Sequence, residues 1–473
     1  MMAYEYDLVI LGGGTAGYVA AIKASQLGLK TAIVEKENLG GTCLHKGCIP
    51  TKSMLKSAEI AHSMRNADLY GISSVTPEID MSKIQGRKQE VVDRMHGGVK
   101  HLMKKHKVDI FSGHGRILGP SIFSPMAGTV AVEHPEDEEA ESEILINQNV
   151  LISTGSHPRA LPFLPFDHKL ILSSDDMMGL DHIPSRMAII GGGVIGLEFA
   201  SMLTDLGSEV TVIEAGDHLV PHEDKDITNQ LRKSLESRGV TFKIGNALDE
   251  SSIDKQEESI ALSLDDGELS VDKVLVAIGR GPNTDDLGLT NTKIKLNKGY
   301  IETNSNYQTD DAHIYAVGDV IGNLQLAHVA TKEAIAAVEH MADENPYPID
   351  YNSVPRCIYT YPEVAAIGMT EAVLKQQSID YSAHKVPFAA VGKAVISHGD
   401  KGFGKILVDP ETKDILGLSL IGPGATELIN EAALAKFLDA SALELGSAIH
   451  AHPSIGEVLM ELGLDAEDKG IHV

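Results

Sequence analysis

One pattern occurs twice in the first half of the chain, and it restricts the fold more than any other feature. Residues 7–35 read DLVILGGGTAGYVAAIKASQLGLKTAIVE, and residues 186–214 read RMAIIGGGVIGLEFASMLTDLGSEVTVIE. Each copy has a short apolar segment, a GGGxxG turn, an Ala- and Leu-rich helical pattern and a β-branched segment ending in Glu. The first glycines lie 179 positions apart, and the Glu follows that glycine by 23 positions in both copies. Such matched units predict two dinucleotide-binding domains in one chain.

The three glycines of each copy have separate tasks. The first permits the tight turn, the second lets the backbone approach a pyrophosphate, and the third lets helix and strand pack closely. In order, these glycines are Gly12, Gly14 and Gly17 in the first copy and Gly191, Gly193 and Gly196 in the second. The helix N-terminus offers free N–H groups to the phosphates. Glu35 and Glu214 are placed to accept hydrogen bonds from ribose hydroxyls, although the glycines by themselves would also suit ordinary strand–helix turns.

Charge and composition exclude several classes of protein. The chain has 473 residues, with 40 Lys and Arg against 67 Asp and Glu, a formal charge of −27. This acidity argues against nucleic acid or an anionic membrane as a partner, since both require a basic surface. No apolar run approaches the ~18 residues of a membrane span. Three cysteines cannot form a secreted disulfide framework, and the N-terminus lacks the basic segment of a signal peptide, so we expect a cytoplasmic protein.

The rest of the chain is less strongly patterned. Residues 133–143 hold seven carboxylates in eleven positions and predict a solvated hairpin or loop, with an acidic docking patch as the alternative. From about Asn352, alternating strand patterns and Gly turns precede two Ala- and Leu-rich helical patterns. This tail predicts a separate α+β domain.

Two cysteines stand close to the first glycine pattern. Cys43 and Cys48 occur in GGTCLHKGCIPTK, five positions apart, whereas a structural zinc site would normally need a second cysteine pair. Five residues around a helix start suit a small disulfide loop. The helix N-terminus, Lys46 and Lys52 would lower a thiolate pKa, as redox exchange requires. We interpret the pair as a redox-active disulfide beside a flavin, with two inert thiols as the alternative, and Cys357 as an ordinary buried thiol.

A histidine and a carboxylate form the third constellation. The segment HAHPSIGE places His452 five positions before Glu457, so the carboxylate could orient the imidazole. An imidazole of this kind has a pKa near neutrality and suits a general base acting on a thiol. Spacing alone leaves a structural role for His452 equally open.

Together, GGTCLHKGCIPTK, the paired GGGxxG units, AVGDV and HAHPSIGE resemble the pyridine nucleotide–disulfide oxidoreductases, and the resemblance runs from end to end. It implies an α/β fold with two Rossmann-like domains, FAD in the first and NAD in the second, plus a C-terminal α+β dimerisation domain. The expected segments are an FAD-binding domain at 1–150, an NAD-binding domain at 151–275, a central segment at 276–350 that completes the FAD domain, and an interface domain at 351–473.

The resemblance also assigns roles to residues. Cys48 matches the sulfur next to the flavin and Cys43 the sulfur that exchanges with substrate. His452 matches the acid–base residue, which reaches the other subunit's disulfide across the dimer interface, with Glu457 orienting it. Lys52 would lie near the flavin's reactive edge, where Glu198 could pair with it. Besides the first glycine set, the flavin contacts fall on Glu35, Lys52, Gly115, Thr154, Gly155, Asp319, Gln325, Leu326, Ala327 and His328. Besides the second glycine set, the NAD contacts fall on Glu198, Glu214 and Gly279.

Within the family, the motifs are most similar to the members that oxidise protein-bound dihydrolipoyl groups to lipoyl groups with NAD⁺. This implies a homodimer, and as partners the lipoyl domains and the core or peripheral-subunit-binding domain of a 2-oxo acid dehydrogenase complex. Two departures concern the choice of complex. Lys46 in LHKGC resembles members attached to branched-chain complexes, and Gly456 stands where Ser is common. No metal site is expected.

The alternatives are another flavin disulfide reductase, such as a glutathione reductase-like enzyme, and a non-catalytic flavoprotein subunit. Glu214 favours NAD because its carboxylate would repel a 2′-phosphate, and the following AGDHL supplies no Arg to bind one. Glutathione and thioredoxin reductases usually take NADPH. Mercuric reductases and high-molecular-weight thioredoxin reductases need a second C-terminal cysteine pair. The C-terminal sequence MELGLDAEDKGIHV contains no cysteine. The intact cysteines, His452 and Glu457 argue against a non-catalytic subunit.

Overall fold

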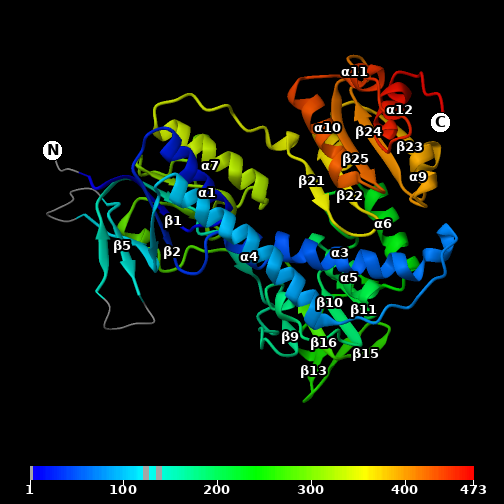
Figure 1. The fold of residues 1–473 in the computed structure, drawn as a ribbon, viewed down its shortest axis with the longest axis horizontal. Helices are drawn as coiled ribbons and strands as arrows, with labels where there is room; N and C mark the ends of the chain where they lie inside the picture. Colours follow the sequence, from blue (N-terminus) through cyan, green and yellow to red (C-terminus); the bar gives the residue numbers. More distant parts are fainter. Residues whose placement is uncertain (1–3, 121–126, 135–140) are drawn as a thin grey trace. The chain divides into compact units, whose positions relative to one another are not determined.

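A computed structural model describes residues 4–120, 127–134 and 141–473 (Figure 1). The chain divides into two compact units, of which the first comprises residues 1–53, 85–159 and 280–349. The second comprises residues 54–84, 160–279 and 350–473. This division differs from the four segments expected from the sequence, whose boundaries stay a prediction. Among the described residues, no helix is both long and apolar enough to cross a membrane.

The first unit is built on a parallel five-stranded sheet. Its strands, in order across the sheet, are β20 (Ile314–Ala316), β7 (Asn147–Ile152), β1 (Tyr6–Leu11), β2 (Thr31–Glu35) and β3 (Asp109–Ser112). The inner strand β1 is an unbroken apolar run because parallel sheets are covered on both faces. The helix α1 (Thr15–Gln26) joins β1 to β2 and lies beside α7 (Ala327–Met341), as Figure 1 shows. The first repeat therefore forms the expected strand–turn–helix–strand unit.

A small antiparallel sheet carries the acidic stretch. It consists of β4 (His114–Ile117), β5 (Val130–Glu133) and β6 (Glu143–Leu145). Val132 of β5 pairs with Glu143 of β6, so the stretch at 133–143 connects the two strands of a hairpin. Residues 135–140 lie outside the described part of the chain, and the idea of an acidic docking patch there stays a prediction.

The second unit holds the second parallel sheet. Its strands, in order, are β12 (Thr241–Ile244), β11 (Glu209–Glu214), β10 (Arg186–Ile190), β16 (Lys273–Val276) and β9 (Ile171–Leu172). Helix α5 (Val194–Leu206) joins β10 to β11, and α6 (Lys225–Ser237) joins β11 to β12. The second repeat therefore forms the same unit as the first.

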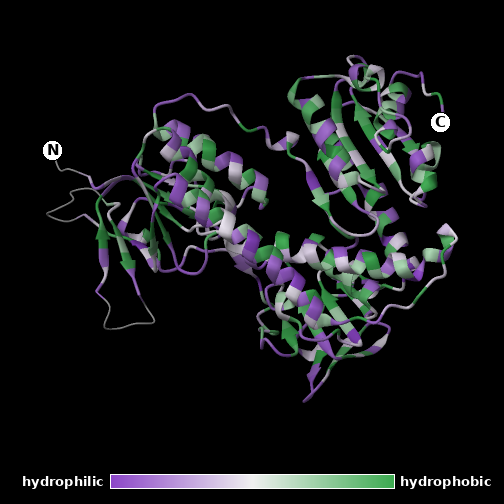
Figure 2. Cartoon of the chain, viewed as in Figure 1, coloured by the Kyte–Doolittle hydropathy of each residue, from purple (hydrophilic) through white to green (hydrophobic). Residues whose placement is uncertain are grey.

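The C-terminal residues form an antiparallel sheet with helices, which confirms the expected α+β tail. The strand order is β21 (Arg356–Ile358), β22 (Val364–Gly368), β25 (Ile415–Ile421), β24 (Phe403–Val408) and β23 (Ser382–Pro387). Its central strands are mostly hydrophobic (Figure 2) and form a buried cluster with α10 (Ala425–Phe437), α11 (Ala442–Ser447) and α12 (Glu457–Ala466).

The remaining elements in the described part of the chain are five α-helices and several short strands outside the three five-stranded sheets. The helices are α2 (Gly41–His45), α3 (Cys48–Arg65), α4 (Met81–Lys105), α8 (Glu371–Gln377) and α9 (Gly392–Ile396). The remaining strands form three antiparallel groups: β13 (Ile253–Lys255), β14 (Ile260–Leu264) and β15 (Gly267–Val271); β8 (Ser156–Pro158) with β17 (Arg280–Pro282); and β18 (Leu296–Asn297) with β19 (Tyr300–Ile301).

Candidate active site

The segment that leads from β2 to Cys43 packs directly on the first glycine turn. The N–H of Gly40 donates to the carbonyl of Gly13 at 2.8 Å, and Gly40 has a φ of 107°. At Gly41, a Cβ would lie 2.7 Å from the Cα of Gly14. The two glycines before Cys43 therefore allow the backbone of the loop to reach the dinucleotide fingerprint, which brings α2 and its cysteine to that site.

We expect Gly41→Ala to destabilise the chain more than Gly28→Ala. Both glycines have positive φ, 59° and 83°, so each substitution costs ~1–2 kcal/mol of backbone strain. A Cβ at Gly28 would meet no atom within 4 Å, whereas at Gly41 it would overlap Gly14 and cost a further ~1–3 kcal/mol. Denaturant midpoints of the two variants test this. Equal midpoints would show that the loop does not depend on this close approach.

Cys43 lies in α2, and Cys48 is the first residue of α3; neither is in a disulfide in this structure. The two thiols are in hydrogen-bond contact. This bond, then burial and the charge of Cys48, raise the pKa of the Cys43 thiol well above its ordinary value. Lys52 acts in the opposite direction. Cys43 is therefore the thiol that keeps its proton, and Cys48 accepts its hydrogen bond.

The predicted lowering of a thiol pKa is wrong for Cys43. The neighbouring Cys48 thiol and burial raise the pKa of Cys43 by more than Lys52 lowers it. Lys46 pairs with Glu37 instead, with 2.6 Å between Nζ and Oε2.

Two residues of the first helical turn also act on Cys43 and escaped the sequence analysis. The side chain of Thr15 hydrogen-bonds Cys43 and lowers its pKa, although not enough to offset the increase. Burial raises the pKa of Tyr18, and its neighbour Cys43 acts in the same direction. Both residues follow the GGG turn directly in sequence, and this position could have indicated that they lie close to the cysteine pair.

The first glycine turn has the features of a dinucleotide site. The carboxylate of Glu35, at the end of β2, accepts from the N–H of Gly13 at 2.6 Å and from that of Glu37 at 2.7 Å. A Cβ at Gly14 would meet only the Cα of Gly41, at 3.9 Å, which leaves room for a pyrophosphate at the start of α1. The Nε2 of Gln325 is buried and has no hydrogen-bond partner among the described residues. The open turn and the unpaired donor fit FAD.

Two of the other expected flavin contacts, Thr154 and Gly155, lie beside the same turn. A Cβ at Gly12 would lie 2.6 Å from the carbonyl of Ser153, so Thr154 and Gly155 follow directly beside the fingerprint. Asn283 fixes this segment, because its amide donates to the carbonyl of Thr154 at 2.8 Å and its N–H to that of Gly155 at 3.0 Å. Sequence reasoning missed Asn283, since nothing local marks its pairing.

Asp319, Gly115 and the 325–328 segment also lie in the first unit. Asp319 accepts a hydrogen bond from Ser156, which in turn accepts from Arg280 Nε at 2.7 Å. A Cβ at Gly115 would lie 2.6 Å from Leu11 Cδ2, so its backbone packs against the end of β1. The remaining expected contacts are found at the start of α7: Leu326 occupies the N-cap position, followed by Ala327 and His328. Direct contacts of these residues with FAD stay a prediction.

The second glycine turn repeats this geometry in the second unit. The carboxylate of Glu214, at the end of β11, accepts from the N–H groups of Gly192 and Gly216, both at 2.6 Å. A Cβ at Gly193 would meet nothing within 4 Å, which leaves space for phosphates before α5. A Cβ at Gly191 would lie 2.4 Å from the carbonyl of Ala277, so Gly279, with a φ of 114°, follows beside the turn. This arrangement fits NAD.

Glu198 is a buried carboxylate of α5, with 4% exposure. It accepts a hydrogen bond from the N–H of Tyr359 at 3.0 Å. Its expected pairing with Lys52 joins residues of different units and stays a prediction.

His452 and Glu457 form the expected pair. The Nδ1 of His452 lies 2.8 Å from Glu457 Oε1, while Oε2 accepts from the N–H of Ser454 at 2.9 Å. These bonds, with that of His452 the larger, lower the pKa of Glu457. The His452 side chain is 78% exposed, so the carboxylate orients the imidazole and leaves Nε2 for another reactant. Cys357, expected to be buried, is only partly so.

Comparisons with known proteins agree with this geometry. Residues 6–334 match the pyridine nucleotide-disulphide oxidoreductase family, and residues 354–462 match its dimerisation domain. The chain is 50% identical to a dihydrolipoyl dehydrogenase of Bacillus subtilis over the full length of both proteins. It is 38% identical to the mitochondrial dihydrolipoyl dehydrogenase of Pisum sativum, over 99% of this chain and 93% of that protein.

A solved structure extends the similarity to three dimensions. The crystal structure of LpdA from Mycobacterium tuberculosis matches with a TM-score of 0.89 and 28% identity. The match covers 97% of this chain and 99% of LpdA, so the predicted fold class is confirmed. The chain belongs to the pyridine nucleotide-disulphide oxidoreductase family, among its dihydrolipoyl dehydrogenases.

Proposed function

We propose that this chain oxidises protein-bound dihydrolipoyl groups to lipoyl groups with NAD⁺ as the acceptor. Family membership implies FAD and NAD as cofactors. The observation that carries the proposal is the hydrogen-bonded pair of Cys43 and Cys48, placed on the first dinucleotide fingerprint. The direct test is the appearance of NADH when the purified, flavin-loaded chain receives dihydrolipoamide and NAD⁺.

In this proposal the two cysteines divide the work of disulfide exchange. A substrate thiolate attacks Sγ of Cys43 in the oxidised pair, and the bond to Cys48 breaks, releasing Cys48 as a thiolate. The second substrate thiol then loses its proton to solvent, and its sulfur attacks the substrate sulfur bound to Cys43, which forms the lipoyl disulfide and releases Cys43. The raised pKa of Cys43 favours its reprotonation, and its proton then hydrogen-bonds the Cys48 thiolate. Bound FAD and NAD⁺ supply the hydride chemistry by which the electron pair leaves the dithiol.

His452 is the proposed acid–base group of this exchange. It accepts the proton of the attacking substrate thiol at Nε2 and returns one when Cys43 is released. Glu457 holds Nδ1 at 2.8 Å and stabilises the imidazolium that forms. By the resemblance, the disulfide served is that of the partner subunit.

A homodimer is supported by the match of residues 354–462 to a dimerisation domain. The same part of the chain exposes several large apolar side chains, which a partner subunit would cover. They are Leu434 at 59%, Phe437 at 60%, Leu438 at 65% and Ile449 at 101% relative exposure. Ile449 lies three positions before His452, so a subunit contact there would bring a partner close to the imidazole.

The remaining partners and the location are part of the same proposal. The lipoyl substrate and the core or peripheral-subunit-binding domain would belong to a 2-oxo acid dehydrogenase complex, with a branched-chain complex as one candidate because of Lys46. A net charge of −27 favours a basic docking segment, whose affinity would fall as salt rises. We propose the cytoplasm as the location, on the basis of cysteine usage.

We expect Glu214→Ala to reduce the preference for NAD⁺ over NADP⁺. Two backbone N–H groups at 2.6 Å hold this carboxylate in place at the strand end, where it would accept from ribose hydroxyls and repel a 2′-phosphate. Loss of a charged hydrogen bond of ~1.5–3 kcal/mol predicts a reduction of about 10- to 100-fold in the ratio of kcat/KM values.

Glu209→Ala is the matched control, because Glu209 lies exposed at the other end of the same strand. Its ratio should equal that of the unmodified protein. Equal rates with both nucleotides in the unmodified protein would refute the role given to Glu214.

A further inference from the structure

The loop that carries Glu214 is anchored at its far end by two cations of the C-terminal sheet. We propose that Arg356 and Lys405 are positioning residues for nucleotide binding, which hold the segment 214–224 against the second glycine turn. This inference rests on the proposed function, since it concerns NAD bound at that turn. Arg356, Lys405 and the segment 214–224 all belong to the second unit.

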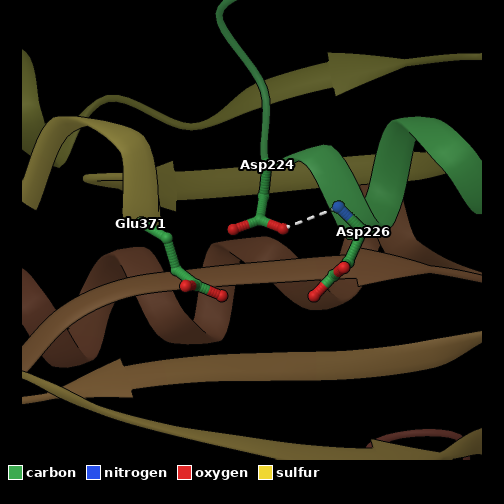
Figure 3. Close-up of side chains that lie close together, drawn as sticks. All are labelled: Asp224, Asp226 and Glu371. Carbon is green, nitrogen blue, oxygen red and sulfur yellow. Dashed lines mark hydrogen bonds between the residues drawn. The ribbon is translucent and has the colours of Figure 1, made fainter. Parts of the chain in front are cut away.

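Lys405 is a buried cation inside a group of carboxylates. Its side chain, on β24, is 2% exposed, and its Nζ donates to both oxygens of Asp224 at 2.9 Å. It also donates to Asp226 at 2.9 Å and to Glu371. Figure 3 shows these three carboxylates, with Asp224 capping α6 through a hydrogen bond from the N–H of Asp226. One carboxylate oxygen from each of the three acids lies within 4.8 Å of the others, and the ammonium of Lys405 is the cation that they share.

The charges in this cluster are stabilised by one another. Burial alone would lower the pKa of Lys405, but its bonds to Glu371, Asp226 and Asp224 raise it above the ordinary value. Hydrogen bonds from Lys375, then Lys405, with one from Tyr381, lower the pKa of Glu371 to about 2. The ion pair therefore persists at neutral pH and fixes the start of α6 to the C-terminal sheet.

Arg356 makes the second anchor one residue earlier in the loop. From β21 it forms a two-point contact with Glu223, with Nε at 2.7 Å from Oε1 and Nη2 at 3.1 Å from Oε2. The Glu223 side chain is 6% exposed and that of Arg356 is 19% exposed. Paired, planar contacts of this kind fix orientation as well as distance.

A chain of backbone contacts leads from these anchors to the nucleotide turn. The N–H of Glu223 donates to the carbonyl of Val220 at 3.0 Å, and the N–H of Val220 donates to the carbonyl of Gly192 at 3.0 Å. Gly192 in turn donates its N–H to Glu214 at 2.6 Å. The two cations of the C-terminal domain are thus connected, contact by contact, to the carboxylate that would bind the ribose.

The two ion pairs are not needed to hold the C-terminal sheet against the second parallel sheet and its helices. Apolar packing already joins these layers, because Ile358, Val364 and Ile421 share a buried cluster with Leu197 and Leu231. Both cations bind consecutive residues, Glu223 and Asp224, at the end of the loop. Loss of either ion pair should therefore change the geometry of the segment 214–224, while the apolar packing between the C-terminal sheet and the second parallel sheet stays in place.

The test uses Arg356→Gln, Lys405→Met and the double variant Arg356→Gln/Glu223→Gln, with Arg186→Gln as the matched control. Arg186 pairs with Asp272 at 3.0 Å at the far end of β10 from the glycine turn. We expect the dissociation constant of NAD⁺, measured by calorimetry on the flavin-loaded dimer, to rise about tenfold in the anchor variants and to stay unchanged in Arg186→Gln. Bound FAD and the reduction of an artificial acceptor by dihydrolipoamide should be unaffected. Hydrogen exchange should become faster in peptides covering 214–224.

The double variant keeps the test decisive if a single variant fails to fold, because it leaves no buried charge unpaired. Unchanged NAD⁺ affinity and unchanged exchange at 214–224 in a folded anchor variant would overturn the inference. If the unmodified chain itself fails to bind NAD⁺, the proposed function is contradicted, and the inference falls with it.

Discussion

Cys48→Ser will abolish the NAD-linked oxidation of dihydrolipoamide while FAD stays bound. The exchange needs a sulfur that can leave as a thiolate and form a disulfide with Cys43, and a serine oxygen does neither. Loss of a covalent participant of this kind lowers turnover by on the order of 10³-fold or more. Turnover with dihydrolipoamide and the visible absorption of bound flavin measure the two halves of the prediction.

Cys357→Ser is the control for this experiment. Cys357 lies in β21, in the C-terminal sheet, and is the third cysteine of the chain. Its replacement should leave turnover unchanged. If Cys48→Ser retained full activity, the redox pair would not be the reacting group, and the proposed mechanism would fail.

His452→Gln will slow the thiol half-reaction by about 10²- to 10⁴-fold, the usual contribution of a general acid–base group. The substrate thiol must lose a proton to attack, and released Cys43, whose pKa is raised by Cys48 and burial, must regain one. Transfer of electrons from NADH to an artificial acceptor needs no such proton at the thiols. Rapid mixing with dihydrolipoamide, compared with that acceptor assay, separates the two steps.

His450→Gln provides the matched control, two residues away. The His450 side chain is 8% exposed, and its Nε2 lies 2.8 Å from Glu431. It is oriented by a different carboxylate, so its replacement should leave the thiol half-reaction near its original rate. A His452→Gln variant that loses both half-reactions equally would indicate a structural role and refute the acid–base assignment.

The features that could be predicted from the sequence depend on residues that lie close together along the chain. The glycines at 12–17 and 191–196 predict their strand–turn–helix units because the turn, the helix start and the terminal Glu are all encoded within about one βαβ unit. The pairing of His452 with Glu457 was predictable for the same reason, since only five positions separate them. The alternation of strand patterns after Asn352 similarly predicted the C-terminal domain.

The features that the sequence did not reveal depend on contacts between distant residues. Arg356 lies 133 positions from Glu223, and Lys405 lies 181 positions from Asp224, so no local pattern marks either pair. Asn283 is 129 positions from Thr154, whose backbone it fixes. The error over the Cys43 thiol has a related origin. Its pKa depends on the direction of the Cys48 side chain and on burial, which become visible only in the folded chain.

The most direct test of the account compares two assays on the same purified, flavin-loaded protein. One follows NAD⁺ reduction by dihydrolipoamide, and the other follows NADPH oxidation by glutathione disulfide. The Cys43–Cys48 pair is common to both reactions, whereas Glu214 favours NAD, so the comparison tests substrate and nucleotide together. We expect rapid NADH formation in the first assay and little or no reaction in the second. Faster reduction of glutathione disulfide with NADPH, or no reaction with dihydrolipoamide, would contradict it.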